Sequence, residues 1–180
     1  MAEPGRCGRC QSHPPAFDYC HSPLLYSHPI AGWIRAIKDD QQLNWIHRLL
    51  WLMLQEPPLN LDNIDALVVM PSSRRRLITR GYNVAGMLAD RLSQHYGKPL
   101  ILHALHKRHT TDQRGLSAKE RHRNQKRAMN GNQLDLSGQH LLLIDDVMTT
   151  GATAGAAANA LKKQGASIVG IWVLARTPAH

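Results

Sequence analysis

Four short runs of consecutive hydrophobic residues predict buried β-strands. They lie at residues 66–70, 100–105, 141–144 and 167–174, and branched aliphatic side chains dominate them. A strand that is apolar at nearly every position is typical of the interior of a parallel sheet, where both faces are covered. The run at 141–144 has four apolar residues in succession, so we expect it at the centre of the sheet.

Between residues 30 and 54 the hydrophobic residues instead recur every three or four positions, which predicts amphipathic helices. A polar cluster at 39–42 divides this region into two helices, and the prolines at 57 and 58 end it. The apolar positions of the two helices are Ile30, Trp33, Ile34, Ile37, Ile46, Leu49, Leu50 and Met53.

Three tryptophans, Trp33, Trp45 and Trp51, belong to the same helical region. Together they could form a platform on which nucleobases stack. A Trp within an apolar helical stripe more often packs in the core, however. We therefore interpret all three as packing residues.

Further helices are expected, among them one from about residue 81 to residue 95 and one from residue 154 to residue 164. Small residues at 156–158 let the second helix lie close to a sheet, and Gly165 ends it. Strands and helices thus alternate along the chain. This alternation predicts an α/β fold, with a central, mainly parallel sheet flanked by helices and right-handed crossovers.

The segment that follows the central run combines acidic and hydroxyl side chains. Asp145 and Asp146 come directly after the run, and Thr149, Thr150 and Gly151 lead into an Ala-rich helix. Open α/β sheets bind ligands at the carboxyl ends of their strands. Hydroxyls, backbone N–H groups and a helix N-terminus suit a phosphate, and neighbouring carboxylates suit vicinal hydroxyls or a metal ion. The sequence therefore predicts a site for a phosphorylated sugar.

A second polar loop, rich in arginine, follows the strand at 66–70. It contains Ser72, Ser73, Arg74 and Arg75, with Arg80 a few residues further on. Parallel strands end at the same edge of a sheet, so this loop should lie near the acidic pair. Because arginine offers paired donors to phosphate oxygens, we interpret the loop as an anion-binding segment. A surface cluster of ion pairs is the alternative.

The chain carries a net charge of +9, which favours polyanionic partners such as nucleic acid or phosphorylated metabolites. Much of the excess lies at 106–127, where eight Lys or Arg and two Asp or Glu give a net charge of +6. A solvated basic face is the alternative to contact with phosphate or nucleic acid. This stretch contains no Phe, Trp or Tyr, so binding of DNA there would be mainly electrostatic.

No targeting or membrane segment is predicted. Residues 1–15 are polar and lack the apolar region of a signal peptide. The longest apolar run, at 49–54, is too short to span a bilayer, so we expect a cytoplasmic protein without membrane insertion. Three cysteines in such a compartment argue against a disulfide framework.

Three segments of the chain resemble the type I phosphoribosyltransferases and, within that superfamily, the ComF family of competence proteins, which includes GntX-like proteins. Residues 145–153, DDVMTTGAT, are similar to the superfamily's motif for phosphoribosyl pyrophosphate (PRPP). Residues 71–85, PSSRRRLITRGYNVA, are similar to the Arg-rich ComF segment that ends in RGFNQA. Residues 108–124 match the ComF pattern R-x-T-x-x-Q-x-x-L-x-x-x-x-R-x-x-N. The likeness runs from about residue 5 to the C-terminus.

The resemblance implies a phosphoribosyltransferase-like domain at 30–180, in which residues 30–65 form a hood, and a site that binds PRPP together with Mg²⁺. Asp145 and Asp146 would hold the ribose hydroxyls and the metal ion. A flexible loop would close over PRPP and exclude water. The 5′-phosphate would be held by Val147, Met148, Thr149, Thr150, Gly151, Ala152 and Thr153. The pyrophosphate would be held by Ser72, Ser73, Arg74, Arg75 and Arg80. The flexible loop would contribute Arg108, Thr111, Gln113 and Arg121.

Residues 1–29 resemble half of the four-cysteine zinc finger found at the N-terminus of ComF proteins. Cys7 and Cys10 look like its second cysteine pair, and the first pair is absent, as though the chain began late or had lost half of the finger. Cys20, His13 or His21 could complete a zinc site with them. A single C-x-x-C is weak evidence for zinc, so we favour a disordered remnant of the finger.

Two departures from the family patterns bear on chemistry. Val84 stands where ComF proteins usually have Gln, and Thr149 stands where some purine-type relatives have an acidic acid/base residue. The sequence therefore names no acceptor nucleobase.

Two functions fit these observations. One is an enzyme that transfers phosphoribosyl from PRPP to an unknown acceptor. The other is a non-catalytic factor that senses PRPP and binds single-stranded DNA through the basic surface at 106–127. The ComF resemblance favours a role in DNA uptake during natural competence for either. The glycine-rich motifs of P-loop and dinucleotide-binding proteins are absent from the sequence.

Overall fold

The computed structural model describes residue 12, residues 14–107 and residues 129–178. Within these residues the core is a six-stranded sheet in the order β1-β8-β7-β3-β4, with β2 also paired to β8. All paired strands of this sheet run parallel, as the sequence predicts. The strands are β1 (Tyr19–His21), β2 (Leu24–Leu25), β3 (Ala66–Val69), β4 (Leu100–Ile101), β7 (His140–Met148) and β8 (Ile168–Arg176).

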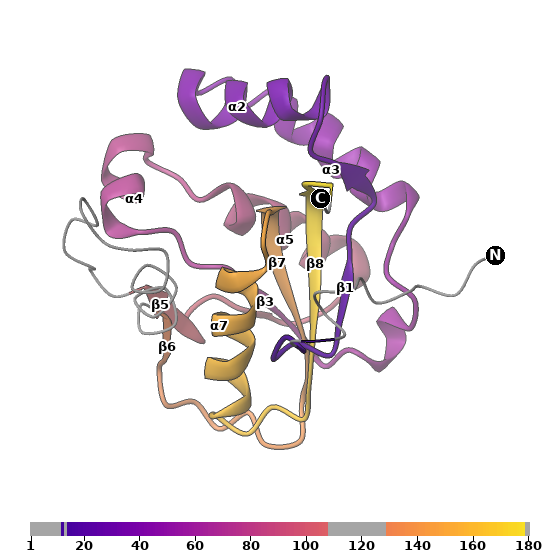
Figure 1. Cartoon of the computed structure of the whole chain (residues 1–180), viewed down its shortest axis with the longest axis vertical. Helices are drawn as coiled ribbons and strands as arrows, with labels where there is room; N and C mark the ends of the chain where they lie inside the picture. The colour runs from indigo at the N-terminus through magenta and orange to yellow at the C-terminus, as the bar shows by residue number, and fades with distance from the viewer. Residues whose placement is uncertain (1–11, 13, 108–128, 179–180) are drawn as a thin grey trace.

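Helices cover both faces of the sheet because the chain crosses it in two directions. It passes from β3 through α5 to β4, and the opposite way from β7 through α7 to β8. Right-handed crossovers in opposite directions place their helices on opposite faces. Figure 1 accordingly shows α7 in front of the sheet, α5 behind it, and α2 above the ends of β7 and β8. The helices are α2 (Ile30–Asp40), α3 (Trp45–Gln55), α4 (Arg74–Arg80), α5 (Val84–Tyr96), α7 (Ala152–Lys162) and a short 3₁₀ turn, η1 (Leu61–Asn63).

The run at 141–144 forms the centre of the sheet, as its hydrophobic pattern predicts. All four of its side chains are fully buried, and β7 pairs with β3 on one side and with β8 on the other. The alanines of α7 bury their small side chains against the rest of the core. This helix begins at Ala152, two residues earlier than expected.

The prediction of one strand at 100–105 is wrong. The structure has two short strands there, β4 and β5 (Leu105–Lys107), which a turn separates. Leu102, in the turn, is 56% exposed. β5 leaves the main sheet and pairs antiparallel with β6 (Met129–Gly131) beside α7. The hydrophobic pattern does not indicate which sheet each half of the run joins, so the turn between β4 and β5 could not be predicted from it.

Residues 19–25 belong to the segment that we interpreted as a disordered remnant, and there this interpretation is wrong, because β1 and β2 extend the main sheet. Asp18 fixes this attachment: its carboxylate accepts a hydrogen bond from the Val169 N–H at 2.7 Å and forms an ion pair with Lys162 at 2.8 Å. A Cβ on Gly170 would come within 2.2 Å of the Tyr19 ring, so the glycine makes room for β1. Strands this short show no readable period.

The hood at 30–65 contains α2 and α3, whose buried residues include the predicted Ile34, Ile37, Leu49 and Met53. The Trp33 and Trp45 rings stack with centroids 4.9 Å apart. Trp51, however, is 60% exposed, so its interpretation as a packing residue is wrong. It lies two positions from both Leu49 and Met53, about 200° around the helix from each, on the solvent side.

Among the described residues, none of the helices combines the length and the hydrophobicity that a bilayer-spanning segment needs.

Candidate functional site

A cavity of about 340 Å³ lies at the carboxyl ends of β3 and β7, where open α/β sheets bind their ligands. It is lined by five segments that are distant in the sequence: Tyr26 after β2, the end of α2, the β3–α4–α5 segment, the end of β5, and the β7–α7 connection. The two polar loops predicted from the sequence therefore meet in one cavity. Of the predicted site residues, the lining includes Ser72, Arg80, Asp145, Asp146, Val147, Met148, Thr149, Thr150, Gly151, Ala152 and Thr153.

The acidic pair lies within the last four residues of β7, which continues to Met148, rather than after the strand. The Asp145 carboxylate accepts a hydrogen bond from the Asp146 N–H at 2.8 Å. Burial of the Asp145 carboxyl and, after it, the neighbouring Asp146 charge raise its pKa to about 7. The Asp146 N–H and the charges of Lys38 and Lys107 act in the opposite direction. Two carboxylates held this close in a partly enclosed site are poised to accept donors or a cation.

The connection from β7 to α7 has the geometry of an anion site. Gly151 precedes the helix with a φ of +74°, and the Ala152 N–H lies 3.4 Å from the Thr150 hydroxyl. A Cβ on Gly151 would make only ordinary contacts, so the backbone conformation, rather than lack of space, favours glycine here. Because α7 begins at Ala152, the N–H groups of its first turn point toward the cavity end of the helix, where they and the helix dipole favour a phosphate.

The arginines divide into two groups because α4 begins at Arg74. Ser73 caps this helix, with its hydroxyl 3.4 Å from the Arg76 N–H. Arg74 and Arg75 are exposed and do not line the cavity, and Ser73 does not line it either, whereas Arg76 does. The sequence analysis missed Arg76. Its spacing of four residues from Arg80 was an available signal, because residues at i and i+4 share a helix face.

Asn83 fixes the loop that carries Ser72. The Ser72 hydroxyl donates to the Asn83 side-chain oxygen at 3.0 Å, and the Asn83 amide donates to the Met70 carbonyl at 3.0 Å. Val84, which replaces the usual Gln of the family, lines the same cavity and is 3% exposed. The Asn83 side chain thus serves the loop's conformation and leaves Ser72 facing the cavity.

The hood supplies a cation to the site. Lys38, in the last turn of α2, places its Nζ 2.8 Å from an Asp146 carboxylate oxygen, and both side chains are largely buried. The sequence analysis assigned no site role to Lys38. A contact between residues more than a hundred positions apart leaves no local pattern to find.

Lys107, at the end of β5, brings a further cation to the cavity. Burial lowers its pKa, and the nearby Arg76 guanidinium lowers it further, whereas the Asp145 charge raises it. The flexible-loop residues Arg108, Thr111, Gln113 and Arg121 lie outside the described residues.

The predicted zinc ligands are not tested by the structure. Cys7 and Cys10 lie outside the described residues, and Cys20 lies in β1, opposite Ile171 of β8. Among the residues that are described, no group of three or more His, Cys, Asp or Glu side chains has a metal-binding arrangement. A zinc site stays the untested alternative to the remnant of the finger that the sequence favours.

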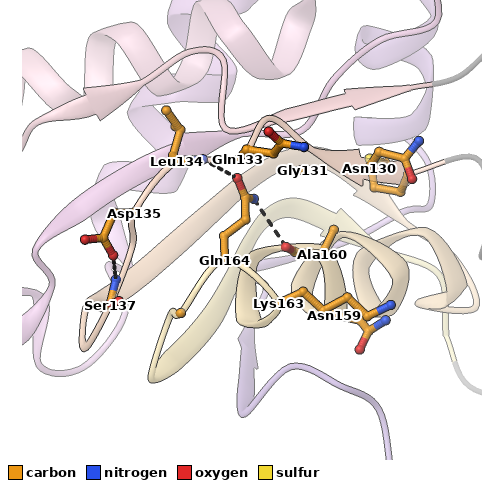
Figure 2. Close-up of a pocket in the computed structure, with 12 residues that line it drawn as sticks. Asn130, Gly131, Gln133, Leu134, Asp135, Ser137, Asn159, Ala160, Lys163 and Gln164 are labelled. Atoms are coloured by element: carbon orange, nitrogen blue, oxygen red, sulfur yellow. Dashed lines mark hydrogen bonds between the residues drawn. The ribbon is translucent and has the colours of Figure 1, made fainter.

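A larger cavity of about 1120 Å³ lies elsewhere, between β6, the following loop and the second half of α7. Figure 2 shows Gln164 within it, accepting a hydrogen bond from the Leu134 N–H at 3.0 Å and donating to the Ala160 carbonyl at 3.2 Å. Asp135 likewise accepts from the Ser137 N–H at 3.0 Å. These polar groups already have hydrogen-bond partners within the protein. We therefore place the functional site in the smaller cavity, where side chains of opposite charge converge, and not in the cavity with the larger volume.

Comparison with known proteins finds relatives of this chain. Residues 77–180 match the family described as the phosphoribosyl transferase domain. The chain is 32% identical over 177 residues to the DNA utilization protein YhgH of Salmonella typhimurium, covering 95% of this chain and 78% of that protein. It is also 32% identical over 179 residues to competence protein F of Haemophilus influenzae, covering 94% and 78% respectively. A purine phosphoribosyltransferase from Pyrococcus horikoshii Ot3 superposes with a TM-score of 0.44 and 18% identity, over 74% of this chain and 82% of that one.

The chain therefore belongs to the phosphoribosyltransferase domain family and, within it, to the ComF-like proteins that include competence protein F and YhgH. The resemblance and the fold class predicted from the sequence are thereby confirmed.

Proposed function

We propose that the cavity at the ends of β3 and β7 binds PRPP. The observation that carries this proposal is that one small cavity gathers an acidic pair, a helix N-terminus behind a hydroxyl loop, and several basic side chains. A ligand that bears vicinal hydroxyls and two separate phosphate groups matches all three features. A simple nucleotide or an inorganic phosphate leaves at least one of them without a partner.

Each part of the ligand has a matching part of the site. The ribose 2′- and 3′-hydroxyls donate to Asp145 and Asp146, whose carboxylates accept hydrogen bonds. The 5′-phosphate lies against residues 149–153 and the first turn of α7, where N–H groups and hydroxyls converge. The pyrophosphate lies toward Ser72, Arg76 and Arg80, because guanidinium groups pair well with phosphate oxygens.

Mg²⁺ is the metal ion that fits this arrangement. Mg²⁺ is usually held by one or two carboxylates together with substrate oxygens and water, and Asp145 and Asp146 offer adjacent carboxylates of this kind. These two residues would hold the ion with the ligand. Bound there, Mg²⁺ would neutralise part of the pyrophosphate charge.

The site supports binding more directly than transfer. Departure of pyrophosphate depends on positioning and on stabilisation of charge, both of which the basic side chains supply. Thr149 provides no acid/base at neutral pH, so the loop at 149–153 offers the acceptor no group that could remove its proton. Release of pyrophosphate from PRPP in the presence of one of the nucleobases would identify a transferase. If no nucleobase causes release, the protein binds PRPP without transferring phosphoribosyl to a base.

The biological role we propose is in DNA uptake or utilisation, because the two curated relatives carry the names DNA utilization protein and competence protein. A second candidate function is binding of single-stranded DNA by residues 106–127, which carry a net charge of +6. Binding of this kind weakens steeply as salt concentration rises. An affinity for single-stranded DNA that does not change with salt would contradict it.

Calorimetric titration of PRPP with Mg²⁺ tests the proposal. We expect micromolar binding by the unmodified protein and loss of at least about tenfold in affinity for Asp145→Ala/Asp146→Ala. The matched control is Asp62→Ala/Asp90→Ala, which removes two exposed carboxylates away from the cavity and should leave the affinity unchanged. Equal affinities for the two double variants would refute the assignment.

A further inference from the structure

The last turn of α2 is attached to the site by three consecutive residues. The Ile37 carbonyl accepts a hydrogen bond from the Tyr82 hydroxyl, Lys38 pairs with Asp146 at 2.8 Å, and Asp39 pairs with Arg80 at 3.3 Å. The partners of this turn belong to the end of α4, to the α4–α5 connection and to β7. The hood is therefore fixed to both sides of the cavity at a single turn of helix.

Two of these contacts occupy groups that a ligand would need. Asp146 and Arg80 both line the cavity, and each is paired with a residue of the hood. The Lys38–Asp146 pair is the more enclosed, with exposed fractions of 20% and 16%, against 23% and 62% for Arg80 and Asp39. Of the two ion pairs, we therefore expect Lys38–Asp146 to have the larger effect on ligand binding.

A ribose whose hydroxyls bond to Asp146 competes directly with Lys38. A carboxylate that accepts hydrogen bonds from the ribose and also holds Mg²⁺ has little capacity left for a close ammonium partner, and an ammonium group that loses its partner in a partly buried site is costly. Lys38 has a flexible four-carbon stem and three donors, and it lines the same cavity as the basic residues that face the pyrophosphate. Phosphate oxygens are therefore the nearest replacement for Asp146.

We propose that Lys38 is a ligand-binding residue that exchanges partners: it pairs with Asp146 in the free protein and with the pyrophosphate of the bound ligand. The inference rests on the proposed binding of PRPP. It explains why the hood carries a buried cation over the acidic pair, and it makes tight binding conditional on a ligand that has both the hydroxyls and the pyrophosphate. A ligand with the hydroxyls alone breaks the Lys38–Asp146 pair without offering a replacement.

Two ligands and one substitution separate this role from a purely structural one. Ribose 5-phosphate has the sugar and the 5′-phosphate but lacks the pyrophosphate. For Lys38→Met we expect PRPP to bind at least about tenfold more weakly, while ribose 5-phosphate binds as tightly as to the unmodified protein or more tightly, because no ion pair must be broken. Calorimetric titration of both ligands with Mg²⁺ measures this ratio, and thermal unfolding shows whether the variant is folded. Lys38→Gln serves as the second variant if Lys38→Met does not fold.

Two control variants sharpen the test. Lys38→Arg keeps the positive charge and should restore most of the preference for PRPP. Asp39→Asn breaks the neighbouring hood ion pair without changing a residue that lines the cavity, and should leave the ratio of the two affinities within about twofold.

The outcomes are distinct. An equal loss of affinity for both ligands in Lys38→Met would show that Lys38 only positions the hood, and no loss for either would show that it has no role in binding; both refute the exchange while leaving PRPP binding intact. Failure of the unmodified protein to bind either ligand would refute the proposed function and this inference with it.

Discussion

Substitution of Asp145 by Asn should stabilise the protein at neutral pH, although it removes a carboxylate from the proposed binding site. Burial and the Asp146 charge raise the pKa of Asp145 to about 7, from an ordinary value of 3.8. Between these two values the unfolded chain has lost the proton while the folded chain keeps it, so this group makes stability fall as pH rises from about 4 to about 7. At about 1.4 kcal/mol for each factor of ten in proton affinity, the ionised group costs the fold up to on the order of 4 kcal/mol above that window.

Asparagine keeps the oxygen that accepts the Asp146 N–H and never ionises, so it should remove this cost. We expect urea unfolding to show Asp145→Asn gaining stability over the unmodified protein, by little at about pH 4 and by a few kcal/mol at about pH 8. The control is Asp135→Asn, at an exposed carboxylate whose pKa is lowered by hydrogen bonds from Ser137. It should give no gain at the higher pH. A stability difference for Asp145→Asn that is the same at both pH values would refute the reasoning.

Two further predictions concern the phosphate-binding parts of the cavity. Gly151→Ala should cost on the order of 1 kcal/mol of stability, because alanine is disfavoured at a φ of +74°, and should weaken ribose 5-phosphate binding; thermal unfolding and titration measure the two effects, and unchanged binding would count against the anion site at α7. Arg76→Ala should weaken PRPP binding by about tenfold or more, whereas Arg74→Ala should change it by less than about twofold, since only Arg76 lines the cavity. Equal effects of the two arginine variants would place the pyrophosphate elsewhere.

The centre of the fold and the acidic side of the site were predictable because their signals are local. The signal lies within one short stretch of sequence: four apolar residues, then Asp145 and Asp146, then a Thr-Thr-Gly loop. The hydrophobic run determines that the strand is central, and the strand's direction places the loop at the ligand-binding edge.

The basic side of the site was only partly predictable. Residues 74–76 are three identical arginines, and which of them faces the cavity depends on where α4 begins, which the Ser73 cap decides. The contact of Lys38 with Asp146 joins segments that come together only in the folded chain. Strand β1 has three residues and adds to an existing sheet edge, so its pairing, rather than its own pattern, makes it a strand.

The binding account must also be separated from the attraction of a basic protein for any polyanion. The chain carries a net charge of +9, and such a protein attracts inorganic tripolyphosphate or ATP without a dedicated site. The acidic pair is what distinguishes the cavity from a basic patch, because carboxylates repel phosphate and favour a ligand with hydroxyls or a metal ion beside it.

The most direct measurement is therefore a calorimetric comparison of PRPP with inorganic tripolyphosphate, each with Mg²⁺ and at the same ionic strength. The account predicts micromolar binding of PRPP, with one ligand per chain, and binding of tripolyphosphate that is weaker by at least about tenfold. Equal affinity for the two ligands, or no binding of PRPP, would contradict the central claim that this cavity is a phosphoribosyl site.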